Sequence, residues 1–168
     1  MFIDIHVHAS PRRHPEITRA NGSHYPDAET LIQMMDNAHI DKACIMAGVS
    51  PECRYTVVTV EDVVGLCAQH PDRLIPFCNL DPRYLTNDAS ADFSNLLGAF
   101  KDMGCKGVGE CTFNLPFDDP RCLNLFEAVE DARDARAGDR ELRAQIVLGD
   151  AALRLLVQYL QSIEFTSS

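Results

Sequence analysis

Two histidines near the start of the chain have the spacing of a metal site. In the opening stretch MFIDIHVHAS, apolar and polar residues alternate as in a β-strand, which places Asp4, His6 and His8 on one face. Residues i and i+2 of a strand lie about 6–7 Å apart, so the two imidazoles can bind one divalent cation at Zn–N distances of about 2.0–2.1 Å. Asp4 lies one step deeper, where it would orient the cluster. A lone His-x-His pair is more often structural than metal-binding, so the surrounding elements must indicate which of the two roles applies.

The elements that would position this pair alternate between strand and helix. The patterns predict strands at 2–8, 41–49, 73–82 and 105–113 and helices at 27–40, 60–71, 88–103 and 120–133. Repeated strand–loop–helix units predict an α/β fold with a parallel sheet. Ligands of such sheets bind at the carboxyl ends of the strands. The polar residues at those ends are His6, His8, Asn79, Asp81 and Glu110.

The last part of the chain departs from this rhythm. Residues 131–144 are dense in charge, and the pattern predicts a short fifth strand at 145–150 and a leucine-rich helix at 151–163. We therefore interpret 1–168 as a single domain, in which β/α units occupy 1–131 and a divergent C-terminal segment occupies 132–168.

The bulk composition limits the classes of partner. The chain has 168 residues, of which 46% are hydrophobic and 24% charged, as in a soluble globular domain. A formal charge of −10 argues against nucleic acid or an anionic membrane surface as the main partner. No stretch has the pattern of a signal peptide or a membrane span. The seven cysteines form no CxxC pair, which predicts reduced thiols and a cytoplasmic location.

Four motifs in order carry a resemblance to a known family. DIHVHA, DKACIMAG, RLIPFCNLDP and CKGVGECTFNLPFDDP together resemble the amidohydrolase superfamily of metal-dependent hydrolases, in the amidohydrolase-2 branch that includes decarboxylases. The resemblance covers residues 1–131 and implies a TIM barrel with its metal at the C-terminal face of the strands. It implies that His6 and His8 are first-strand ligands of a divalent metal, most simply Zn²⁺. GVGE at 107–110 resembles the fourth-strand acid of TatD-like hydrolases, which implies that Glu110 is the third ligand.

The sequence departs from the family in its second half. The family pattern expects histidines ending strands five and six and an aspartate base ending strand eight, yet no histidine follows His70. Asp150 stands where the fifth-strand histidine is expected and is the one candidate for a catalytic base. The chain corresponds to about half of a (β/α)₈ barrel, as a truncated relative, a fragment or the product of a frameshift near residue 132. Three readings stay open: a hydrolase acting through a metal-activated water on a small molecule, a related decarboxylase, and a non-catalytic domain serving in assembly.

Substrate contacts and assembly complete the expectations. Arg12 and Arg13 in the first loop are candidates to hold a substrate carboxylate through two parallel hydrogen bonds, and His24 in the same loop is a candidate substrate contact.

A half barrel leaves two edge strands without a partner, whereas a closed barrel has no edge strands. The apolar helix 151–163 therefore predicts a homodimer, or a larger assembly, that buries these surfaces.

Overall fold

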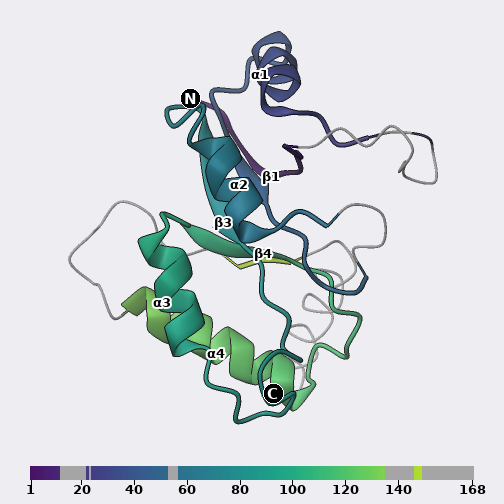
Figure 1. Ribbon diagram of the computed structural model, residues 1–168, viewed down its shortest axis with the longest axis vertical. Coiled ribbons are helices and arrows are strands. Elements are labelled where there is room, and N and C mark those ends of the chain that lie inside the picture. Colours follow the sequence, from purple (N-terminus) through teal and green to yellow (C-terminus); the bar gives the residue numbers. More distant parts are fainter. Residues whose placement is uncertain (12–21, 23, 53–56, 135–145, 149–168) are drawn as a thin grey trace, which may run out of the picture.

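Strands and helices alternate along the chain, as the computed structural model shows (Figure 1). The structure describes residues 1–11, 22, 24–52, 57–134 and 146–148. The elements are β1 (Ile3–Val7), α1 (Ala28–Asn37), β2 (Lys42–Met46), α2 (Val60–Cys67), β3 (Leu74–Cys78), α3 (Ser94–Asp102), β4 (Gly107–Cys111), α4 (Pro120–Asp134) and β5 (Ile146–Leu148). The predicted helix 151–163 lies outside the described residues.

All five strands belong to one parallel sheet in the order β1-β2-β3-β4-β5. Each strand therefore lies beside the next one in the chain, the order in which a (β/α)₈ barrel is wound. The sheet curls, and a helix connects each strand to the next one along the chain (Figure 1). The predicted α/β fold, a partial TIM barrel, is confirmed.

The two faces of the sheet bury different side chains. Along β2, Ala43 and Ile45 join the large core that includes helix residues, because alternate residues of a strand point the same way. Cys44 and Met46 point to the opposite face and pack with Phe77 in a second, smaller cluster. Burial on both faces explains why ACIM and LIPF read as continuous apolar runs. The six described cysteines are buried and free.

Most helix boundaries agree with their sequence signals. Asp27 caps α1, and its carboxylate accepts a hydrogen bond from the backbone N–H of Thr30. Pro120 is the first residue of α4, where its missing N–H costs nothing. Helix α2 begins at a capping box, in which Thr59 and Asp62 each bond to the backbone N–H of the other.

The predicted helix 88–103 is wrong at its start. Helix α3 begins only at Ser94, although it ends at Asp102 and is followed by Gly104 with φ 102° as expected. Asp88 accepts a hydrogen bond from the backbone N–H of Ser90, and Asp92 accepts one from that of Ser94. Such local side-chain bonds compete with a helix, so the chain turns before α3 begins.

The outer side of β1 is open to solvent among the described residues. Ile3 is 41% exposed and Ile5 is 49% exposed, and the adjoining Met1 and Phe2 are exposed still further. Within the described part of the chain, β1 stands at the end of the strand order and pairs with β2 alone. In the described ranges, no helix is long and apolar enough to cross a membrane.

Candidate metal centre

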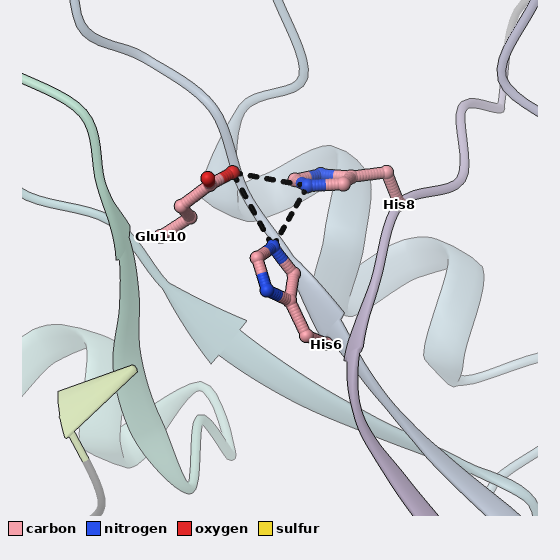
Figure 2. A group of neighbouring side chains, drawn as sticks. All are labelled: His6, His8 and Glu110. Carbon is pink, nitrogen blue, oxygen red and sulfur yellow. Dashed lines mark hydrogen bonds and ion pairs between the residues drawn. The ribbon is translucent and has the colours of Figure 1, made fainter. Parts of the chain in front are cut away.

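His6, His8 and Glu110 converge at the carboxyl edge of the sheet (Figure 2). The two Nε2 atoms are 3.2 Å apart. The Glu110 Oε2 atom lies 3.1 Å from Nε2 of His8 and 3.4 Å from Nε2 of His6. The side chains are 33%, 23% and 23% exposed in the order His6, His8 and Glu110, so the group is open on one side. The structure thus brings together the three residues predicted as metal ligands.

The spacing of these three atoms fits one small cation. Tetrahedral ligands at about 2.0–2.1 Å from Zn²⁺ lie about 3.3 Å from one another. The three separations are 3.1, 3.2 and 3.4 Å. Two imidazole nitrogens and a carboxylate oxygen are also a donor set that zinc accepts, and three protein ligands leave a fourth position free. The residues present therefore fit a divalent metal.

A register shift in β1 positions the two histidines. The pairing with β2 is irregular between Asp4 and Val7, the segment that contains His6. At this irregularity the backbone N–H of His6 donates to Asp4 Oδ1 at 3.0 Å. Such irregularities re-aim side chains next to active sites. Asp4 thus holds the backbone that carries His6, as its place one step deeper on the strand predicted.

A second register shift positions Glu110. The pairing of β4 with β5 is irregular between Gly109 and Cys111, so Glu110 lies at the shift itself. Its backbone carbonyl accepts a hydrogen bond from Nδ2 of Asn79, which directly follows β3. Cys111 is buried in the core, away from the ligands.

The charge of Glu110 is favoured by its neighbours. The hydrogen bond with His8, together with the charges of His8 and His6, holds the pKa of the Glu110 carboxyl below its usual value, although burial opposes this shift. Glu110 therefore offers an ionised oxygen to the centre of the group, as a metal ligand must.

One side of the centre is a small cavity. Tyr25 stacks on His8, with ring centroids 5.2 Å apart and planes inclined by 25°. His8, Tyr25 and Glu110 line a cavity of about 40 Å³, together with Ala47, Gly48, Val58 and Thr112. A space of this size holds a water molecule.

The segment after β2 is fixed to the ends of the neighbouring strands. Ser50 Oγ donates to the backbone carbonyl of Thr112 at 3.2 Å. Tyr84 donates its hydroxyl to the carbonyl of Val49 at 3.2 Å. These bonds hold the segment that includes Gly48, one wall of the cavity, against the carboxyl edge of the sheet.

The remaining predicted site residues do not join the centre in the described structure. Arg12, Arg13 and Asp150 lie outside the described residues. His24 is described and exposed. Asp81, at the end of β3, is paired with Arg83, whose Nε donates to its Oδ1 at 2.7 Å.

Sequence reasoning missed two residues that contact the ligands. Tyr25 precedes Pro26 in a polar stretch, and no periodicity marks it as a neighbour of His8. The sequence places Asn79 at the end of a strand but does not connect it with the ligands, because its partner, the carbonyl of Glu110, is a backbone atom that no side-chain pattern reveals.

Comparisons with known proteins identify the architecture. No protein-family model matches the sequence, and no curated protein matches it. One similar structure is a "probable 2-pyrone-4,6-dicarboxylic acid hydrolase" from Acinetobacter baumannii with citric acid bound, at TM-score 0.55 and 18% identity over 88% of this chain and 57% of that one. Another is an uncharacterised TIM-barrel protein from Bordetella bronchiseptica, at TM-score 0.53 and 17% identity over 77% of this chain and 52% of that one. A third, an amidohydrolase II, has TM-score 0.53 and 19% identity over 88% of this chain and 50% of that one.

These structural similarities show a shared fold. The chain spans about half the length of each of these structures. It has the architecture of part of a TIM barrel.

Proposed function

We propose that this chain is an amidohydrolase-type enzyme domain that binds one divalent cation through His6, His8 and Glu110 and hydrolyses a small-molecule substrate. The observation that carries the proposal is the triangle of two Nε2 atoms and one Oε2 atom, with sides between 3.1 and 3.4 Å. The triangle lies at the carboxyl edge of a parallel sheet, where the active sites of β/α barrels are built.

The protein residues prepare the site in three ways. His6 and His8 direct their Nε2 atoms to one point, and Glu110 adds a negative charge there. Asp4 fixes the backbone of His6, and Tyr25 covers one face of the His8 ring. When bound, Zn²⁺ supplies hydroxide at neutral pH, because it lowers the pKa of a water ligand to about 7. Asp150, outside the described residues, remains the candidate for the base.

A carboxylated small molecule is the substrate class that fits best. Arg12 and Arg13 follow the two histidines closely in the sequence, and guanidinium groups bind carboxylates through paired hydrogen bonds. The similar structure from Acinetobacter baumannii carries a dicarboxylic acid hydrolase name and holds citric acid, a tricarboxylate. The same class of substrate would suit a decarboxylase, so the reaction product distinguishes the two chemistries.

Metal content tests the proposal directly. Purified wild-type protein should carry near-stoichiometric zinc, manganese or iron by elemental analysis, and the double variant His6→Ala/His8→Ala should lose it. His39→Ala is the matched control, because His39 is exposed just after α1 and has no part in the triangle. Equal traces of metal in all three proteins would show that the triangle is not a metal site.

Turnover then separates an enzyme from a domain that serves in assembly. Because the chain spans about half of its structural neighbours, a metal-binding but non-catalytic domain is the second candidate. Zinc-loaded protein should hydrolyse 2-pyrone-4,6-dicarboxylate or a related carboxylated lactone, with release of a ring-opened acid and no CO₂. Metal binding without any turnover would favour the assembly role.

A further inference from the structure

Asn79 makes one hydrogen bond and leaves one buried atom unused. The residue is 2% exposed and follows β3 directly. Its Nδ2 atom donates to the backbone carbonyl of Glu110. Its Oδ1 atom is buried and has no hydrogen-bond partner in the described part of the chain. A carbonyl oxygen only accepts hydrogen bonds, so the amide must turn its NH₂ group towards Glu110 and its oxygen away.

This arrangement is costly for the fold alone. A buried acceptor without a partner lowers stability, whereas an apolar side chain of the same shape would carry no such penalty. What the amide provides in return is its donor, and that donor holds the one residue of β4 that faces the histidines. The unpaired oxygen that lowers stability therefore lies next to the candidate metal centre. Functional sites are where natural proteins most often keep such unfavourable features.

The register of β4 explains why Glu110 needs this support. Pairing with β5 is irregular between Gly109 and Cys111, so the regular ladder does not define the backbone at Glu110. β1 shows the same combination, because His6 lies within a register irregularity and its N–H is held by the Asp4 carboxylate. In both β1 and β4, regular strand pairing is interrupted near a proposed ligand. At each interruption, a side chain forms a hydrogen bond to the backbone of that ligand residue.

We infer that Asn79 is a positioning residue for Glu110: its amide anchors the Glu110 backbone and so sets the carboxylate at the third corner of the metal triangle. The inference rests on the proposed metal centre and adds the residue that follows β3 to a site whose ligands lie on or directly after β1 and on β4. Partners of metal ligands act in this way when they fix the orientation of the ligand before the metal arrives.

Cobalt is the probe for this role, because bound Co²⁺ has visible absorption bands that report its ligands. Asn79→Leu keeps the shape of the side chain and removes the donor. Its affinity for Co²⁺ should be about 10- to 100-fold weaker than that of wild type, the range found when partners of metal ligands are removed. The shape of the visible band should change as well. Asn79→Ala, which is smaller and has no side-chain donor, should show the same loss if the leucine does not fit.

A matched control separates positioning from general support of the fold. Asn124 also donates its side-chain amide to a backbone carbonyl, that of Ala91 at 2.9 Å, but on α4 and away from the triangle. Asn124→Leu should leave Co²⁺ affinity within about twofold of wild type and keep the same band, whatever it does to the thermal midpoint. All proteins are titrated at a temperature where circular dichroism shows them folded.

The outcomes separate this inference from the proposed function. If wild type binds Co²⁺ and the Asn79 variants bind it equally well with an unchanged band, the inference is wrong and the metal centre stands. If wild type itself gives no band, the metal centre fails and the positioning role fails with it. Weakened binding in the Asn79 variants but not in Asn124→Leu supports the role of Asn79.

Discussion

Tyr25 stacks on the imidazole of His8, with ring centroids 5.2 Å apart and planes inclined by 25°. The contact restrains the ring of a proposed ligand from a segment that precedes α1. Aromatic pairs contribute about 0.5–1.5 kcal/mol beyond their buried area. Tyr25→Ala should therefore weaken zinc binding by about two- to tenfold, as measured by competition with a coloured chelator. Tyr25→Phe retains the stacked ring and should bind zinc like wild type; equal loss in both variants would assign the effect to the hydroxyl.

The buried carboxylate of Asp81 should contribute far more to stability than an exposed one in a similar ion pair. Asp81 is 1% exposed and bonds to Arg83, whereas Asp36 is 59% exposed and pairs with Arg73 at 2.7 Å. Asp81→Asn should cost about 2 kcal/mol or more, because it breaks a buried pair. Asp36→Asn, the same change on the surface, should cost less than about 1 kcal/mol. Urea unfolding of the two variants compares these values, and similar losses would contradict the prediction.

Gly107 should tolerate no side chain while Phe77 lies across it. A Cβ atom at Gly107 would lie 2.6 Å from Cζ and 2.9 Å from Cδ2 of the Phe77 ring. Gly107→Ala should therefore destabilise the protein by about 1–3 kcal/mol, the usual range for an overpacked core. In the Phe77→Leu background, Gly107→Ala should cost less free energy of unfolding than it does in wild type. Strict additivity in this cycle would show that the two positions are not in conflict.

Asp119 should make stability depend on pH in the acid range. The Arg121 side chain, which donates to the carboxylate, lowers the pKa of Asp119 from 3.8 to about 2. Because the pKa is lower in the folded state, the contribution of Asp119 is complete above about pH 4 and is lost as the pH falls towards 2. The difference in unfolding free energy between wild type and Asp119→Asn should therefore shrink from pH 6 to pH 3. A difference that stays constant or grows on acidification would contradict this assignment.

Self-association through β1 is the expected assembly. The outer face of this edge strand exposes Ile3 and Ile5, next to exposed Met1 and Phe2, and among the described strands β1 pairs with β2 alone. Exposed apolar edges of this kind favour pairing with a second chain. Sedimentation at micromolar concentration should show a dimer or a larger species, and Ile5→Glu should shift it towards monomer. Met34→Glu, at an exposed position on α1, is the control; a wild-type monomer would contradict the prediction.

The sequence pattern was sufficient for the architecture because the relevant signals are local. Alternation located β1, and Asp27 and Pro120 marked the starts of α1 and α4. Repetition of strand and helix predicted the parallel sheet. The start of α3 was misplaced because apolar periodicity extends upstream of it, while the competing bonds of Asp88 and Asp92 depend on backbone geometry.

The candidate site was predictable only in part. Strand alternation paired His6 with His8, and the resemblance to a family added Glu110. The supports of these residues were not predictable, because they depend on register shifts in β1 and β4 and on contacts between distant segments. Asn79 contacts a backbone atom at one such shift, and Tyr25 stacks on His8 from just before α1. Neither contact is marked by a periodic pattern or a fixed spacing in the sequence.

The order of the strands bears on how the molecule is assembled during synthesis. Since each strand lies beside the one before it in the chain, every new β/α unit finds its partner already present. His6 and His8 are synthesised before Glu110, which joins them from β4. A nascent chain that lacks β4 therefore cannot contain the complete triangle.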